Sequence, residues 1–135
     1  MSAALMLGIF SRLENWKRDL TTNHAKLDPR SSDHALRPLT IGRSPEEVAA
    51  LIERWAAAQP HWTFESSETT DSEITIHLTR STKLLRFIDD IQIRLTSQVG
   101  GTQIEAESQS RLGKADFGQN PKNLKELVSG LREDR

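Results

Sequence analysis

The sequence predicts an α+β fold of two layers, in which an antiparallel meander sheet of about four strands carries two helices on one face. Two segments, residues 48–55 and 124–131, place apolar residues at helical spacing. Between them, residues 62–110 alternate apolar and polar side chains, which is typical of strands with one covered face and one solvent-facing face. This order of elements favours an antiparallel sheet with both helices on the covered face.

Residues 1–22 combine a short apolar run with an amphipathic pattern. The run at residues 3–10 is far shorter than the roughly 20 residues of a membrane-spanning helix, and no basic residue precedes it. We therefore expect neither a transmembrane span nor a signal peptide. An apolar stripe at helical spacing follows, formed by Phe10, Leu13, Trp16 and Leu20. We expect an amphipathic helix that packs on its own domain or on a sister chain, or alternatively contacts a membrane surface through residues 1–20.

Residues 23–38 mix turn-forming residues with two prolines and keep no sustained period, so we expect an extended arm or linker there. A single α+β domain, residues 39–135, is expected to follow.

Both helices of this domain have recognisable start signals. Ser44 can cap the first helix, Pro45 suits its first position, and Pro60 follows its end. The last helix opens at Asn120 and Pro121.

The alternation indicates which side chains of the strands face the helices. The predicted covered residues are Trp62, Phe64, Ile74, Ile76, Leu78, Phe87, Ile91, Ile93, Leu95, Ile104 and Ala106. The glycine pair at 100–101 predicts a hairpin turn between the last two strands.

The same alternation turns a carboxylate toward the covered face. If Leu95 pairs with Ile104, then Asp89 lies opposite Ser110 on that face. Carboxylates are rarely buried unless they are paired. We therefore expect hydroxyl groups or a local cation to satisfy Asp89, the cations being Arg86, Arg111 and Lys114.

On the opposite face, this register places Arg94 beside Glu105, an opposite-charge pair. A slip by two residues would pair Arg94 with Glu107 instead. Asp89 stays on the covered face in both registers.

The stretches LLRFIDDIQIRL and SQSRLGKADFGQN resemble the bacterial and plastid family called domain of unknown function 1499. The first motif is matched by Phe87, Asp89, Asp90 and Arg94. The second motif is matched by Ser108, Ser110, Arg111, Gly113, Asp116, Gly118 and Asn120. The resemblance covers roughly residues 39–133. It implies the fold, and the family label assigns no activity.

Two departures from the family pattern bear on chemistry. His24 stands where relatives carry a cysteine, and the chain contains no cysteine at all, so a thiol-dependent role is excluded. Glu107 stands where relatives often have an arginine, which weakens an anion-binding role.

The candidate polar cluster consists of Arg86 and the matched residues. We expect it to be a structural polar core, in which Arg111 bridges carboxylates, Gly113 and Gly118 adopt positive φ, and Asn120 caps the last helix. Alternatively it binds a ligand, with Arg111 or Lys114 on an anionic group.

A catalytic role is the remaining alternative for this cluster. Asp89 and Asp90 point to opposite faces of one strand, so two carboxylates on one substrate would have to be Asp89 and Asp116. Such a protein would be a small hydrolase or isomerase that also uses Arg111.

Composition excludes several function classes. The net charge of −1 argues against nucleic-acid binding, and no phosphate-cradling or dinucleotide motif is present, so we expect no cofactor. His61 and His77 can face each other on the first hairpin, with Glu65 or Glu73 as a third ligand, but this is a weak metal candidate. We expect a soluble cytoplasmic protein that acts as a non-catalytic binding or scaffold domain for a protein or small-molecule partner. A membrane-peripheral lipid-handling domain is a further alternative.

Overall fold

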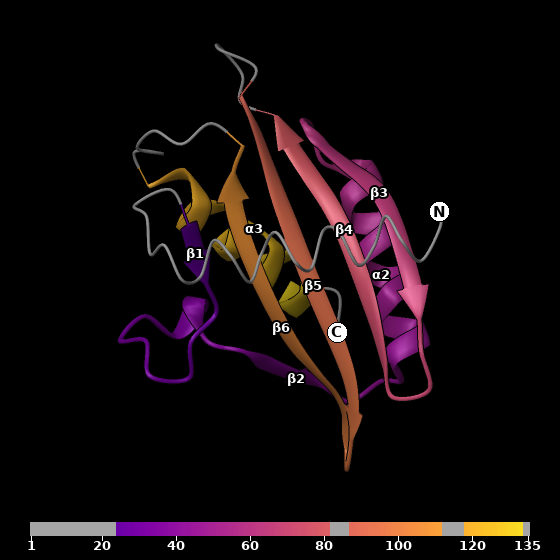
Figure 1. Ribbon diagram of the computed structural model, residues 1–135. Coiled ribbons are helices and arrows are strands. Elements are labelled where there is room, and N and C mark those ends of the chain that lie inside the picture. The colour runs from indigo at the N-terminus through magenta and orange to yellow at the C-terminus, as the bar shows by residue number, and fades with distance from the viewer. Residues whose placement is uncertain (1–23, 82–86, 112–117, 134–135) are drawn as a thin grey trace.

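The computed structural model describes residues 24–81, 87–111 and 118–133, which form a six-stranded antiparallel sheet with two helices on one face (Figure 1). The strands are β1 (His24–Lys26), β2 (Leu39–Ile41), β3 (Trp62–Thr69), β4 (Glu73–Ser81), β5 (Ile88–Gln98) and β6 (Gly101–Ser110). The helices are the short 3₁₀ helix η1 (His34–Leu36) and the α-helices α2 (Pro45–Ala58) and α3 (Gln119–Glu133). The strand order is β1-β6-β5-β4-β3, and β2 also pairs with β6.

The predicted α+β class is confirmed, but the count of about four strands is wrong. The two additional strands come from the start of the chain, where β1 pairs Lys26 with Glu107 and β2 pairs Leu39 with Ile104. Each has three residues, too few to display an alternation in the sequence. They become strands by pairing with β6, whose ten residues are enough to pair with both β1 and β2. The amphipathic helix predicted for residues 1–22 lies outside the described residues.

Both long helices begin close to where the sequence places them. The Ser44 side chain accepts a hydrogen bond from the Glu47 backbone N–H at 3.2 Å, Pro45 is the first residue of α2, and Gln59 follows its end. The apolar stripes of α2 and α3 pack on the sheet and form one core with the inward side chains of β3 to β6. None of the helices in the described ranges is long and apolar enough to cross a membrane.

The two helices approach each other closely at Gly130 of α3. A Cβ at this position would overlap the indole ring of Trp55 on α2, so a side chain has no room there. The Trp55 ring in turn meets Trp62 of β3 edge-to-face, with centroids 4.8 Å apart. The Trp62 indole N–H donates to Glu126 Oε2 of α3 at 2.9 Å. The two tryptophans therefore connect α2, α3 and β3.

The β5–β6 hairpin has the predicted register, with Leu95 opposite Ile104. The Arg94–Glu105 pair is confirmed as well, with Nη1 and Oε2 3.9 Å apart. Gly100 and Gly101 form the turn with φ of 90° and 145°, and a Cβ on Gly101 would overlap the Ile41 carbonyl of β2.

A β-bulge interrupts the edge strand β3. Phe64 pairs with Leu78, and Ser66 pairs with His77, so Glu65 is the extra residue.

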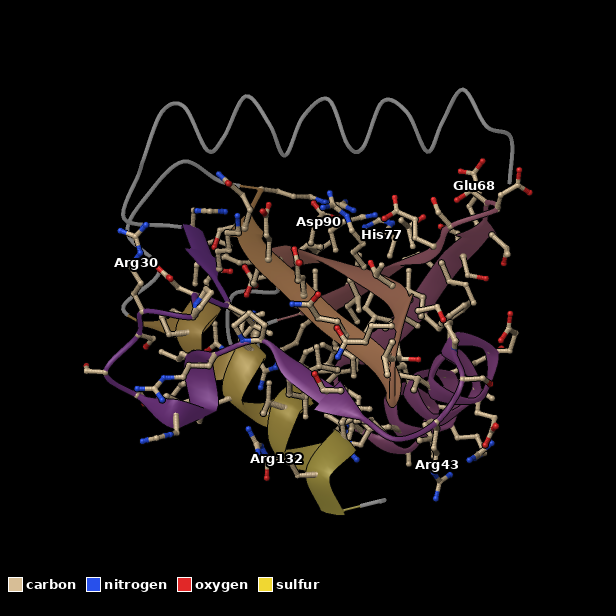
Figure 2. All side chains as sticks on the ribbon, turned by 90° about the horizontal axis from the view of Figure 1, so that it is seen from below. Arg30, Arg43, Glu68, His77, Asp90 and Arg132 are labelled. Atoms are coloured by element: carbon tan, nitrogen blue, oxygen red, sulfur yellow. The ribbon has the colours of Figure 1, made fainter. Side chains whose placement is uncertain are left out.

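The outer face, meaning the face of the sheet opposite the helices, differs from the expected solvent-facing surface. Figure 2 shows two of its side chains, His77 and Asp90, on the side away from α2 and α3. Its central residues are polar, and each is only 3–8% exposed: Ser66, Thr75, His77, Thr79, Asp90, Gln92, Glu107 and Gln109. The alternation in the sequence predicts that polar side chains lie on this face, but it does not predict whether other parts of the protein cover them.

Candidate functional site

Five polar side chains form a closed ring of hydrogen bonds on the helix-covered face, and we call it the Asp89 ring. The carboxylate of Asp89 accepts from Ser110 Oγ at Oδ1 and from Asn123 Nδ2 at Oδ2, each at 2.8 Å. Asn123 Nδ2 also donates to Ser108 Oγ at 3.1 Å. Ser108 Oγ donates to Asn120 Oδ1 at 2.6 Å, and Asn120 Nδ2 donates to Ser110 Oγ at 3.1 Å, which closes the ring.

Strand and helix periods together place these five residues. In the observed register, the odd-numbered side chains of β5 and the even-numbered side chains of β6 point toward the helices. Asp89 on β5 and Ser108 and Ser110 on β6 therefore lie on the same face. Asn120 and Asn123 lie one turn apart on α3, on the stripe that also carries buried leucines. Gln119 Nε2 donates to Asn123 Oδ1 at 2.7 Å and so orients that amide.

Four of the five ring residues are buried, and Ser110 is partly exposed. Asp89 is 1% exposed, and Ser108, Asn120 and Asn123 are 0% exposed. Both carboxylate oxygens accept hydrogen bonds, which is what burial of a carboxylate requires. The ring therefore joins β5, β6 and α3 through polar contacts at one end of the sheet.

A second polar group, which we call the Asp90 triad, lies on the outer face and consists of Asp90, His77 and Arg111. His77 Nε2 donates to Asp90 Oδ1 at 2.7 Å. The guanidinium of Arg111 donates through Nε to Oδ2 and through Nη2 to Oδ1, both at 3.0 Å. This bidentate geometry is the strongest arrangement between arginine and a carboxylate.

The triad keeps the Asp90 carboxylate ionised. Burial of the Asp90 side chain acts to raise its pKa, but the hydrogen bonds from His77 and Arg111, together with their charges, outweigh burial, and the pKa lies below its ordinary value of 3.8. The hydrogen bond to Asp90 likewise raises the pKa of Arg111.

The family comparison covers nearly the whole chain. A family model described as a protein of unknown function (DUF1499) matches residues 11–131. The chain belongs to the DUF1499 family. None of the curated proteins matches it. The DUF1499 match includes β1, β2 and residues 11–23, and so begins well before Leu39, where the motif resemblance begins.

The predicted cluster of this DUF1499 domain divides between the two faces of the sheet. Asp89, Ser108, Ser110 and Asn120 come together in the ring. Asp90 and Arg111 lie in the triad, and Arg94 lies further along the outer face between Glu73 and Glu105. The prediction that Phe87 is covered is wrong: it precedes β5, which begins at Ile88, and it is 41% exposed. The predicted residues outside the described ranges are Arg86, Gly113, Lys114 and Asp116.

Two expectations about individual residues of the DUF1499 cluster need correction. Arg111, which was expected to satisfy Asp89 or to bridge carboxylates, pairs with Asp90, because odd-numbered positions of β6 point outward and residue 111 continues that alternation. Asn120 lies inside the first turn of α3, where its amide bridges the two serines. Gly118 does have the expected positive φ, 82°.

Sequence reasoning missed two important members, Asn123 and His77. The signal for Asn123 was its place three residues after Asn120, on the apolar stripe of the last helix. His77 was correctly placed on the outer face, but its pairing with Asp90 follows only from the β4–β5 register, which sets Thr79 opposite Asp90.

The proposed histidine pair does not form in this DUF1499 structure. His77 lies opposite Ser66 in the middle of β4, whereas His61 precedes β3 and its carbonyl accepts from the Ser81 backbone N–H. Glu65 accepts from Thr79 Oγ1 at 2.7 Å, and Glu73 pairs with Arg94. Among the described residues, no group of three metal-binding side chains is present.

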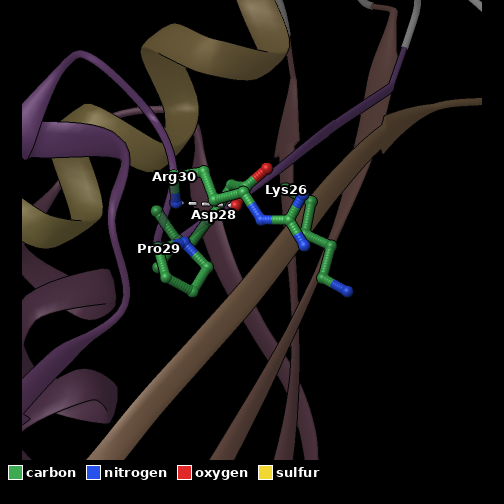
Figure 3. A pocket seen from close by; sticks show the side chains of 5 residues that line it. Lys26, Asp28, Pro29 and Arg30 are labelled. Carbon is green, nitrogen blue, oxygen red and sulfur yellow. Dashed lines mark hydrogen bonds between the residues drawn. The ribbon is translucent and has the colours of Figure 1, made fainter.

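A hollow of about 410 Å³ lies beside β1 and is lined by residues 26–30 (Figure 3). Asp28 Oδ1 accepts from the Arg30 backbone N–H at 2.9 Å and shapes the turn. None of its lining residues belongs to the ring or to the triad, so neither polar group opens into it.

Proposed function

We propose that this DUF1499 domain is a non-catalytic binding or scaffold domain, and that the Asp89 ring has an architectural role in it. One observation carries the proposal: the ring is a closed circuit of hydrogen bonds between two strands and a helix, with an Asp89 carboxylate that is 1% exposed. A catalytic or ligand-binding carboxylate must reach its substrate, whereas this one is engaged on both oxygens by the protein.

The arrangement of the other charged groups favours this role over a hydrolase or isomerase. That alternative needs Asp89, Asp116 and Arg111 around one cleft. Arg111 binds Asp90 on the outer face, while Asp89 faces the helices, so the sheet separates Arg111 from Asp89. Asp116 lies outside the described residues.

The stability of the Asp89→Asn variant tests the proposal. The new amide nitrogen would face a donor of the ring, so we expect the free energy of unfolding in urea to fall by about 1–3 kcal/mol. Asp71→Asn, at an exposed position in the β3–β4 turn, is the matched control and should change it by less than about 0.5 kcal/mol.

A cycle with Asn123→Ala makes the test specific to the ring. If the two residues act as one unit, the double variant should lose less stability than the sum of the single variants. An Asp89→Asn variant as stable as the wild type would contradict the architectural role. So would native mass spectrometry of protein purified from its source, if it showed a small molecule that the folded Asp89→Asn variant no longer holds.

A further inference from the structure

The solvent-facing side of α3 carries a stripe of basic side chains. Four exposed residues lie three or four positions apart, and therefore on one side of the helix: Lys122, Lys125, Ser129 and Arg132. We call these four residues the α3 stripe. It is about 15 Å long, because an α-helix rises about 1.5 Å per residue. Figure 2 shows Arg132 on the side of the molecule away from the outer face, so the stripe and the outer face lie on opposite sides.

The two ends of the α3 stripe carry positive charge that no carboxylate offsets. In the described part of the chain, neither Lys122 nor Arg132 forms an ion pair. Glu126 is an acidic residue on the same helix, but it is engaged by the strands. Its carboxylate accepts hydrogen bonds from Trp62 Nε1 at 2.9 Å and from Arg80 Nη2 at 3.3 Å. Arg80 therefore offsets the charge of Glu126, and the stripe keeps its own.

The neighbouring 3₁₀ helix η1 extends this positive surface. Its cap residue Asp33 pairs with Lys125 Nζ at 2.9 Å, which fixes η1 beside α3. Arg37 follows η1, and its guanidinium donates to the Ser31 carbonyl at 2.7 Å and to His34 Nδ1 at 3.1 Å. Neither acceptor carries a negative charge, so the positive charge of Arg37 adds to that of the stripe.

We propose that the α3 stripe and Arg37, together called the basic surface, bind an acidic segment of a partner protein. The inference rests on the binding role proposed above and names the partner by its charge. The Asp89 ring holds the opposite side of α3 to the strands and so keeps the stripe turned outward. An extended segment of about five residues spans about 15 Å. A short run of Asp or Glu therefore reaches Lys122 and Arg132 together.

An acidic protein segment fits the basic surface better than a lipid bilayer does. Stable attachment to a membrane surface combines basic residues with apolar side chains or a lipid chain that enters the bilayer. The exposed large apolar side chains of the described residues are Phe87 and Val99, and neither lies on α3 or η1. Basic residues alone give an attachment that salt screens.

Fluorescence anisotropy of a fluorescein-labelled decamer of glutamate, titrated with the full-length chain, tests the proposal. We expect saturable binding at about 10 mM salt that weakens toward about 150 mM, because salt screens exposed charges. Lys122→Gln and Arg132→Gln should each weaken binding about fivefold. Lys26→Gln is the matched control, because Lys26 is exposed and pairs with Glu107 on the outer face. It should change the affinity by less than about twofold.

NMR maps where the decamer binds. In ¹⁵N-labelled protein, the amides of α3 and η1 should shift on addition of the decamer, whereas the amides of β4 and β5 should not. Shifts confined to the sheet would place the acidic segment elsewhere and would overturn the proposal.

Three further outcomes would contradict the basic surface as a site for an acidic segment. The first is the absence of binding at low salt. The second is an equal loss of affinity in Lys26→Gln and Lys122→Gln, which would show attraction to overall charge. The third is tighter binding to vesicles of phosphatidylcholine and phosphatidylserine than to the decamer, with loss in the stripe variants, which would assign the surface to a membrane.

The failure of this inference can be told apart from the failure of the architectural role. Lys122→Gln and Arg132→Gln change exposed side chains and should keep the wild-type free energy of unfolding. Asp89→Asn tests the ring through that free energy. A loss of binding without a loss of stability therefore reports on the basic surface alone.

Discussion

Asp89 and Asp90 are adjacent in the sequence, yet the sheet gives them opposite surroundings. Asp89 faces the helices and accepts neutral hydrogen bonds from a serine and an asparagine. Asp90 faces outward and is held by the charged side chain of Arg111 and by His77. Asp90 is therefore the residue whose loss would leave Arg111 without its carboxylate, and the two aspartates should respond differently to substitution.

Asp90→Asn should lower the free energy of unfolding at pH 7 by about 1–3 kcal/mol, because it removes a charge-assisted pair that is only partly exposed. The folded-state pKa of Asp90 lies below 3.8, so ionised Asp90 contributes stability above that pH and loses it as the pH falls through the folded value. The difference from wild type should therefore shrink below about pH 4. Urea titrations from pH 7 to pH 3 measure this difference in the free energy of unfolding, with Asp71→Asn as the exposed control. A difference that stays constant over this pH range would contradict the stabilising role of ionised Asp90.

Helix α3 is held at two points of different character. Near its start, the Asp89 ring binds Asn120 and Asn123 to the strands through polar contacts. Near its end, Gly130 lets the backbone approach the Trp55 ring of α2. Hydrogen bonds therefore position the start of α3, and close packing against Trp55, which only glycine permits, positions its end.

Gly130→Ala should reverse the usual effect of this substitution. At a solvent-exposed position in the middle of a helix, a protein with alanine is more stable than one with glycine by about 0.5–1 kcal/mol. Here the new methyl group would overlap the Trp55 indole, so we expect a loss of about 1–3 kcal/mol. Thermal and urea unfolding measure this loss, and Ser129→Ala, on the exposed side of the same turn, is the matched control. A more stable Gly130→Ala variant would show that the helices are not in close contact.

At the scale of the whole molecule, the sheet is organised around β4, β5 and β6, each of which has partners on both sides. β1 pairs over three residues at one edge. Stability against local opening should follow this order, because opening β1 breaks few contacts, whereas opening β5 disrupts the core.

Native-state hydrogen exchange followed by NMR checks this order. The amides of Ile91, Ile93 and Leu95 in β5 should exchange most slowly, near the rate set by global unfolding. The amides of β1 should exchange through smaller openings and therefore faster. Protection of β1 equal to that of β5 would show that the start of the chain is part of the central unit.

The elements with long, regular periods could be predicted from the sequence, and the short ones could not. Periodicity and capping residues predicted α2 and α3, and strand parity with one charge pair predicted the β5–β6 register and the inward position of Asp89. β1 and β2 were missed because pairing with β6, and not their own three residues, makes them strands. The pairing of Arg111 with Asp90 could have been predicted from the same alternation, because it places both residues on the outer face. The burial of the outer face could not, because it depends on packing that no local pattern encodes.

The bulge at Glu65 bears on how the molecule behaves in a crowded solution. β3 is the edge of the sheet opposite β1, and a straight edge strand offers its backbone to the strands of other molecules. The extra residue bends β3 and breaks its regular hydrogen-bonding pattern, and it places a carboxylate at the break. Another chain that tried to extend the sheet there would lose its register after Phe64, which protects this edge against fibril-like growth.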